Sequence, residues 1–366
     1  MAVLEKGKAV AEYKPSPPKP EYLATICFTS GTTAMPKGVM LTHGNCVADA
    51  TTLLNINVPS VAPFNDVMMS FLPLAHMFER MMELVMFSVG GSVGYYRGDV
   101  KGLADDIKAL RPTIMPVVPR VLNKVYDKVQ AEAGKSIIRS YLLNTAIAIK
   151  SAEMRRFVVR NDSTLDNHVF KKIRDSLGGR LRIMVTGSAP ISDAVMTFMR
   201  AALGCIIIEG YGQTECVAGA TMTIAGDSNT GHVGIPIPAA RIRLVDVPDM
   251  DYIADKNGGE VCIKGPIVFK GYYKNEEETA KTLDADGWLH TGDIGRWTPQ
   301  GTLKIVDRKK HIFKLAQGEY LAPEKIENIY ISSKFVAQCY VYGESLKTCA
   351  IAIVVPDAEV IIYLIK

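Results

Sequence analysis

The chain has 366 residues, of which 48% are hydrophobic and 22% are charged. This balance excludes a wholly disordered, collagenous or coiled-coil protein. The 42 basic and 38 acidic residues leave a net charge of +4, which is too small to indicate nucleic-acid binding. The length exceeds that of one compact core and predicts two or three domains.

The first 20 residues form a Pro-rich lead-in, read as an extended linker. Over residues 21–235, short apolar runs alternate with helical patterns. Strands are predicted at 22–28, 67–72, 92–96, 113–118, 181–185 and 205–209, and helices at 78–87, 100–110, 119–133 and 193–202. Strands alternating with helices of about ten residues predict parallel βαβ units.

The pattern changes after residue 235. Short strands at 241–245, 259–263, 268–272 and 303–305 predict a small antiparallel sheet or barrel over 236–306. From Asp307 onward a basic run is followed by a predicted helix at 323–332 and strands at 337–342 and 350–355. We therefore expect a fourth, α+β region over 307–366.

The seven cysteines are far apart and form no CxxC pair, which indicates reduced thiols. Cys27 and Cys262 lie in apolar runs and are expected in the core, and Cys216 is expected to line a pocket wall rather than to react. The sequence has no window of roughly 20 uncharged apolar residues, so no membrane-spanning helix is predicted in it.

A loop dense in hydroxyls and glycines follows the first strand: Thr29-Ser30-Gly31-Thr32-Thr33-Ala34-Met35-Pro36-Lys37-Gly38. Its N–H groups, hydroxyls and single cation are what phosphate oxygens need. A P-loop of the Walker type is excluded because Gly38 stands where that motif has the Mg²⁺-binding Ser or Thr. The alternative is an ordinary Gly/Ser/Thr-rich turn.

A second motif, Glu209-Gly210-Tyr211-Gly212-Gln213-Thr214-Glu215, lies at the carboxyl end of a predicted strand. Ligands of open α/β sheets bind at this edge. Tyr211 offers a flat face for a base, Thr214 a hydroxyl, and Glu215 a hard oxygen ligand for Mg²⁺. The alternative is a plain strand-to-helix turn.

A third cluster, residues 286–293, ends in Asp293, a carboxylate that can accept hydrogen bonds from two vicinal hydroxyls. Taken alone, a turn aspartate is the favoured interpretation. Arg308 is either a second nucleotide contact or a solvated hinge residue.

The order and spacing of these motifs resemble the acyl-adenylate-forming ligases of the AMP-binding superfamily. Thr29–Gly38 is similar to that family's phosphate-binding signature and Tyr211–Glu215 to its second signature. The segments 259–265 and 271–272 are similar to the strand pair that precedes the ribose aspartate, and Asp307-Arg308 resembles the hinge.

Four further segments, 71–80, 116–120, 307–320 and 322–330, resemble eukaryotic long-chain fatty-acid–CoA ligases, and the resemblance runs from about Leu4 to Asp357. It implies a layered βαβ adenylating domain, of which 21–235 is a part, an antiparallel β-barrel or sheet subdomain, and a truncated α+β C-terminal domain. It also implies that a fatty acid, ATP, Mg²⁺ and coenzyme A react through an acyl-adenylate.

The resemblance assigns roles to individual residues. The β- and γ-phosphates would contact the loop from Thr29 through Ser30, Gly31, Thr32 and Thr33 to Lys37. Thr214 would hold the α-phosphate and Glu215 would bind Mg²⁺. The base and the ribose would be held by Gly187, Ser188, Ala189, Glu209, Gly210, Tyr211, Gly212, Asp293 and Arg308.

Three further assignments follow from the resemblance. His76 is placed near the acyl carboxylate, with a packing or helix-capping histidine as the alternative. Asp307 marks the hinge between the domains. Lys309, Lys310 and Lys314 are candidates for the coenzyme A thiol channel.

Related ligases extend before Leu4 and past Asp357, where they carry a lysine that contacts the reacting carboxylate. We therefore expect this chain to be an internal portion of such a ligase, with impaired catalytic turnover when it acts alone. The alternatives are a non-catalytic ATP- or acyl-adenylate-binding protein and a ligase for medium-chain or aryl acids. The resemblance also implies an intracellular location at the endoplasmic reticulum or outer mitochondrial membrane, peripheral membrane association and self-association.

Overall fold

The computed structural model describes residues 2–8, 15–29, 36–55, 65–309, 312–314, 320–321, 323–333, 335–343, 349–358 and 360. Its largest sheet has seven strands in the order β4-β3-β5-β6-β7-β8-β9. The first five are parallel: β4 (Ser92–Tyr95), β3 (Val67–Ser70), β5 (Ile114–Val117), β6 (Ile183–Thr186) and β7 (Ile206–Tyr211). Strand β8 (Thr221–Met222) pairs antiparallel with β7, and β9 (Ile235–Pro236) pairs antiparallel with β8. The predicted parallel βαβ arrangement is confirmed.

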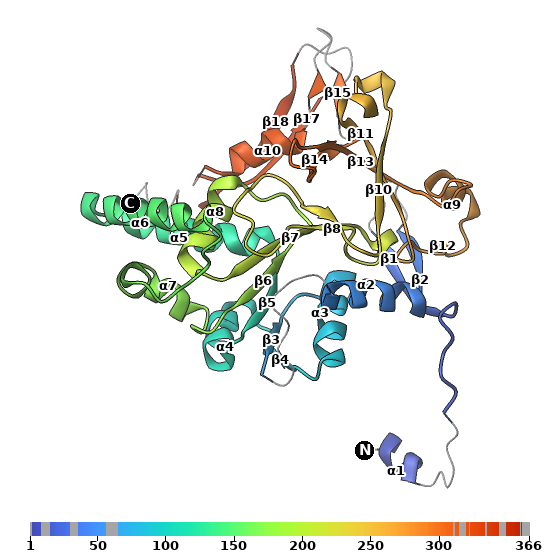
Figure 1. Ribbon diagram of the computed structural model, residues 1–366, viewed down its shortest axis with the longest axis horizontal. Helices are drawn as coiled ribbons and strands as arrows, with labels where there is room; N and C mark the ends of the chain where they lie inside the picture. Colours follow the sequence, from blue (N-terminus) through green and yellow to red (C-terminus); the bar gives the residue numbers. More distant parts are fainter. Residues whose placement is uncertain are drawn as a thin grey trace.

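Helices cover both faces of this sheet (Figure 1). One side carries α2 (His43–Asn55) and α3 (Met77–Ser88). The other side carries α4 (Leu103–Leu110), α5 (Pro119–Gly134), α6 (Ile137–Met154) and α8 (Asp193–Leu203), with α7 (Lys171–Ser176) beside them. Because side chains alternate along a strand, Met68 of β3 packs into the first core and Met69 into the second. This two-sided burial explains why the strands are apolar throughout.

A second sheet is antiparallel, in the order β10 (Arg241–Val245), β11 (Gly258–Lys264), β13 (Leu289–Trp297) and β14 (Leu303–Arg308). A third joins β1 (Leu23–Thr29), β2 (Lys37–Thr42) and β12 (Gly271–Tyr272). The expected pairing of 259–265 with 271–272 is therefore wrong, because β12 pairs with β2. Helix α9 (Glu276–Thr282) lies in a region where few helices were predicted.

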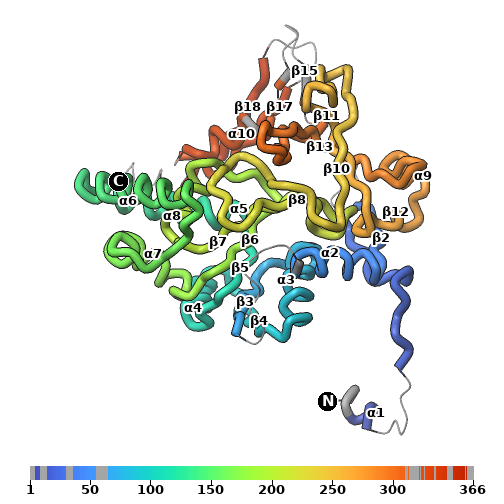
Figure 2. The backbone as a smooth tube through the Cα atoms, viewed as in Figure 1, coloured from blue at the N-terminus to red at the C-terminus, as the bar shows by residue number. Residues whose placement is uncertain are grey.

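The C-terminal region contains two hairpins, β15 (Phe313–Lys314) with β16 (Tyr320–Leu321) and β17 (Val336–Tyr342) with β18 (Ile351–Pro356). Helix α10 (Pro323–Ile331) packs on β17. Figure 2 shows this group beside the β10–β14 sheet. The predicted mixed α/β fold with antiparallel subsheets is confirmed, whereas the three boundaries between the four predicted regions stay predictions. The boundary predicted between residues 306 and 307 falls inside strand β14 (Leu303–Arg308).

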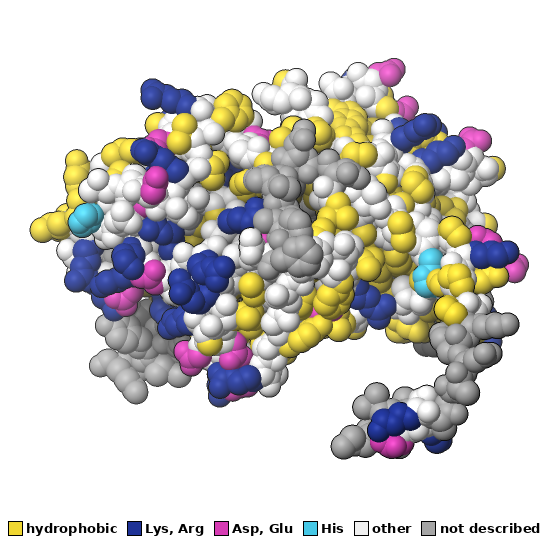
Figure 3. Space-filling view, turned by 60° about the horizontal axis from the view of Figure 1, so that its bottom comes forward, with side chains coloured by type: hydrophobic (Ala, Val, Ile, Leu, Met, Phe, Trp, Pro, Cys, Tyr) yellow, Lys and Arg dark blue, Asp and Glu magenta, His cyan; other side chains and the backbone are white. Residues whose placement is uncertain are grey.

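Two helices differ from what the sequence pattern suggests. Helix α1 (Ala2–Lys8) lies within the Pro-rich lead-in and away from the body of the molecule (Figure 1). Helix α6 buries an apolar stripe that contains Leu143 and Ala146, but Lys150 is buried in the same stripe, while Ile137, Ile138 and Tyr141 are exposed. Hydrophobic side chains are also visible across much of the face in Figure 3. Among the described helices, none combines the length and the hydropathy needed to cross a membrane.

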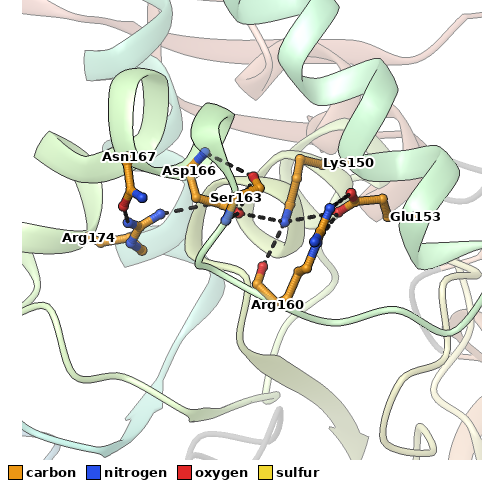
Figure 4. A network of polar contacts seen from close by, with 7 residues as sticks. All are labelled: Lys150, Glu153, Arg160, Ser163, Asp166, Asn167 and Arg174. Carbon is orange, nitrogen blue, oxygen red and sulfur yellow. Dashed lines mark hydrogen bonds and ion pairs between the residues drawn. The ribbon is translucent and has the colours of Figure 1, made fainter.

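Lys150 is buried in a polar network that ties α6 to the segment that follows it (Figure 4). Its Nζ lies 3.0 Å from Asp166 Oδ2 and donates to the Arg160 carbonyl at 2.7 Å. Asp166 also accepts from the Ser163 hydroxyl at 2.6 Å. Because the ammonium and the carboxylate are both removed from water, each stabilises the fold only while the other is present.

We therefore expect Lys150→Ala to lower the free energy of unfolding by about 3 kcal/mol, since it leaves Asp166 buried without its main cation. The matched control is Lys171→Ala, which removes an exposed pair with Asp175 and should cost less than about 1 kcal/mol. Urea unfolding followed by circular dichroism measures both. Equal losses in the two variants would contradict a stabilising role for the buried network.

Candidate functional site

A cleft of about 930 Å³ opens at the carboxyl edge of the parallel strands, where the sheets and α10 meet. Its walls come from the segments after β6 and β7, from β13 and β14, and from α10. Among the predicted site residues it is lined by Ser188, Ala189, Glu209, Gly210, Tyr211, Gly212, Asp293, Asp307 and Arg308. Segments far apart in the sequence are thus brought together as the motifs predict.

The centre of the cleft is a contact between two sheets. The Tyr211 hydroxyl, at the end of β7, donates to Asp293 Oδ2 at 2.7 Å. Arg308, the cross-strand neighbour of Asp293, places Nε 3.5 Å from Asp293 Oδ1. Burial and the adjacent Asp293 carboxylate raise the pKa of Tyr211 well above its usual value, so the phenol keeps its proton. Asp293 lies within strand β13, and the favoured interpretation of a turn aspartate is wrong.

Two glycines allow the backbone segments of this wall to approach each other. A Cβ on Gly187 would lie 2.8 Å from the Gly210 carbonyl oxygen, and one on Gly212 would lie 2.1 Å from that of Ala218. Beside them Ser188 adopts a φ of +68°, a conformation uncommon for residues other than glycine. The segments after β6 and β7 therefore pack more closely than side chains would permit.

Glu209 is a buried carboxyl group in the cleft wall. Burial raises its pKa from 4.5 to about 7, although Arg200 and His232 oppose the shift. Arg200 is itself buried and donates to the Asn229 carbonyl at 2.8 Å. The carboxyl is therefore poised to change its protonation state near neutral pH.

Glu215 and Lys37 both contact Tyr272 and do not belong to the residues that line the cleft. Tyr272 donates its hydroxyl proton to Glu215 Oε1 at 2.8 Å. The Lys37 ammonium lies 5.2 Å from the centre of the Tyr272 ring and forms an ion pair with Glu278 of α9. Thr214 begins the turn that carries Glu215, and Thr29 is the cross-strand neighbour of Lys37. Ser30, Gly31, Thr32 and Thr33 lie outside the described residues.

The remaining predicted residues have other surroundings. His76 is exposed, so the packing alternative is wrong, and within the described part of the chain its side chain makes no capping hydrogen bond to α3. Asp307 is buried and accepts from the backbone N–H of Arg308 and, at 3.2 Å, of Glu324. Burial raises its pKa to about 6. It thereby joins β14 to the start of α10.

The three lysines predicted for the thiol channel have different surroundings. The Nζ atom of Lys309 lies 3.4 Å from Glu260 Oε2. Lys314 belongs to β15, and Lys310 lies outside the described residues. Cys27, Cys216 and Cys262 are buried, and burial raises the pKa of the Cys216 thiol, which disfavours its reaction.

The cleft contains residues that the motifs do not identify, among them His232, Tyr252, Arg296, Lys304, Glu324, Glu327 and Asn328. His232 places Nε2 3.3 Å from Asp227 Oδ2 and accepts from the Gly234 N–H at 3.1 Å through Nδ1. Arg296 follows Asp293 by three residues, so strict alternation would place the two on opposite faces. Both nevertheless line the cleft. The ladder beside them is irregular, because Val306 of β14 is an extra residue opposite Ile294 and Gly295.

Both the sequence and the fold are similar to those of known proteins. The family described as "AMP-binding enzyme" matches residues 2–273, and the chain belongs to this family. Its fold is shared by the adenylation domain of a carboxylate reductase from Mycobacterium chelonae, with a TM-score of 0.76, 30% identity, and coverage of 100% of this chain and 52% of that one. A second structure is the A domain of a carboxylic acid reductase from Segniliparus rugosus, solved with AMP and a co-purified carboxylic acid. It has a TM-score of 0.76 and 26% identity, and the match covers 99% of this chain and 54% of that one.

Within this family, the chain is similar to curated long-chain-fatty-acid–CoA ligases. Long-chain-fatty-acid–CoA ligase 6 of Mus musculus is 58% identical over 361 residues, which cover 98% of this chain and 52% of the relative. Long-chain-fatty-acid–CoA ligase 1 of Homo sapiens is 57% identical over 94% of this chain and 50% of its own length. The chain spans about half the length of the curated relatives it matches.

The raised pKa of Glu209 predicts a pH-dependent stability difference for Glu209→Gln. Between pH 4.5 and pH 7 the folded protein holds a proton that the unfolded chain has released, so this group makes the wild type less stable as the pH rises. The variant lacks this group. Its stability relative to the wild type should therefore rise by about 1–3 kcal/mol between pH 4.5 and pH 8.

Thermal unfolding over this pH range measures the difference. Glu276→Gln, at an exposed position, is the control and should follow the wild-type curve. A constant difference between Glu209→Gln and the wild type at all pH values would contradict the buried acid.

Proposed function

We propose that this chain carries the nucleotide site of a long-chain fatty-acid–CoA ligase, in which ATP activates a fatty carboxylate for transfer to coenzyme A. The observation that carries the proposal is the Tyr211–Asp293–Arg308 contact inside the cleft. The 58% identity to a long-chain-fatty-acid–CoA ligase supports the choice of acid and thiol.

The nucleoside would lie in the cleft. Asp293, already an acceptor for a hydroxyl from Tyr211, would accept from the ribose hydroxyls, and Arg308 would contact the ribose from the next strand. Tyr211 would stack on the base while Glu209 and Gly210 line its edge. The close approach of Gly187 and Gly210 supports this role, because a flat base needs a wall without projecting side chains.

The triphosphate would extend toward Lys37, with Thr214 at the α-phosphate. Glu215 fits the needs of Mg²⁺, because this ion uses one or two carboxylates together with substrate phosphates and water. Mg²⁺ would neutralise phosphate charge.

In the first half-reaction a carboxylate oxygen attacks the α-phosphorus, and the bond to the pyrophosphate oxygen breaks. In the second, the coenzyme A thiolate attacks the acyl carbon and AMP leaves. Both reacting partners of the first step are anions, so the residues of this chain act by holding them in line and neutralising charge. His76 near the acyl carboxylate, Asp307 as the hinge and Lys309, Lys310 and Lys314 in a thiol channel belong to this proposal, as does association with a membrane or a second chain.

The proposal predicts that the purified chain catalyses palmitate-dependent exchange of labelled pyrophosphate into ATP in the presence of Mg²⁺. Octanoate and benzoate, tested in parallel, identify the acid class. Binding of ATP without exchange for any acid would favour a non-catalytic nucleotide-binding protein. Absence of both would contradict the proposal.

A second prediction concerns the ribose. Asp293→Ala should weaken ATP binding at least about tenfold, because a charged acceptor for two hydroxyls is worth more than about 1.4 kcal/mol. Binding of 2′,3′-dideoxy-ATP should weaken less than binding of ATP, since this analogue lacks both hydroxyls and reports only the loss of the contacts of Asp293 with Tyr211 and Arg308. Isothermal titration calorimetry measures both ligands, with Asp286→Ala at an exposed position as the control. Equal losses for the two nucleotides would contradict the ribose role.

A further inference from the structure

Lys37, the cation of the proposed phosphate loop, is paired with an acid from a distant part of the chain. Its ammonium forms an ion pair with Glu278 Oε2, although the two residues are 241 positions apart. The side chains are only 21% and 28% exposed. The second oxygen, Glu278 Oε1, lies 3.2 Å from Lys281 Nζ. A carboxylate therefore occupies the place beside Lys37 where a phosphate oxygen would bind.

The fold holds this carboxylate in position. Asn275 caps α9 by accepting from the Glu278 N–H at 3.1 Å. The Tyr272 N–H donates to the Thr279 hydroxyl at 2.9 Å, which fastens α9 to β12. Strand β12 pairs with β2 through Tyr272 and Val39, two residues after Lys37. Glu278 is thus attached to the strand next to the lysine and is preorganised for the pair.

Lys37 also contacts the ring of Tyr272, which leads to the residue proposed to meet Mg²⁺. The ammonium lies 5.2 Å from the centre of the Tyr272 ring, and the hydroxyl of that ring donates to Glu215 at 2.8 Å. Lys37 and Lys281 together lower the pKa of Glu278, so the carboxylate is ionised near neutral pH. The lysine therefore contacts both Glu278 and the ring whose hydroxyl donates to Glu215.

Resting on the proposed function of the cleft, we propose that Glu278 is a resident anion that occupies Lys37 in the nucleotide-free protein and competes with the phosphates of ATP and pyrophosphate. Binding of either ligand has to separate the ion pair or to bring phosphate charge close to the carboxylate. Both weaken binding. Glu278 is then a positioning residue that limits the affinity for ATP and helps pyrophosphate to leave after the adenylate forms.

The test is the affinity of Glu278→Gln for MgATP and for inorganic pyrophosphate, measured by calorimetry at low salt. Removal of the competing charge should tighten both about threefold to tenfold, and the gain should shrink as salt is added. The control is Glu277→Gln, which removes the same charge from the same helix. Glu277 is 81% exposed and pairs with Lys281 at 2.7 Å, so its loss should change the affinities less than about twofold.

A second comparison separates competition for Lys37 from general repulsion. In a Lys37→Met background, Glu278→Gln should leave the affinity unchanged. If it tightens binding there as well, or if Glu278→Gln binds no more tightly than a wild type that does bind ATP, the resident-anion role is wrong. If neither protein binds ATP, the proposed function fails and this inference fails with it.

Discussion

The site depends on one hydrogen bond between two sheets. Tyr211 ends a strand of the parallel sheet, Asp293 lies in the antiparallel sheet, and their contact at 2.7 Å joins the two walls of the cleft. Arg308 reaches the same carboxylate from β14 because the register of β13 and β14 pairs Asp293 with Arg308. The position of the antiparallel sheet therefore decides whether the motif residues form one site.

Much of the fold could be predicted because burial follows the strand period. Each central strand sends alternate residues into two cores, as Met68 and Met69, or Ile207 and Ile208, do. Such strands read as short apolar runs between helices. Helix α6 was missed because its amphipathic signal is weakened: Leu143 and Ala146 are buried, but Lys150 lies in the same buried face and Ile137 and Ile138 face solvent.

The motif half of the site could also be predicted, because loops that follow parallel strands meet at one edge of a sheet. The other wall depends on contacts that no local pattern encodes. Arg296 lines the cleft with Asp293 although simple alternation along β13 would separate them. Glu324, Glu327 and Asn328 reach the cleft because α10 packs near β14. The ion pair between Lys37 and Glu278 could not be predicted either, because the pairing of β12 with β2 brings these two distant residues together.

A common electrostatic arrangement connects these features. Lys37 and Arg308, the two described cations assigned to the phosphates and the ribose, each contact a carboxylate, that of Glu278 and Asp293 respectively. Paired cations are oriented in advance and attract stray anions less strongly than isolated ones. A ligand gains from them only if it also satisfies the carboxylates left behind. Ribose hydroxyls can donate to Asp293, whereas phosphate offers Glu278 no proton. In the proposed function the two ends of the site would therefore treat an incoming nucleotide differently, with the nucleoside end suited to retention and the phosphate end to exchange.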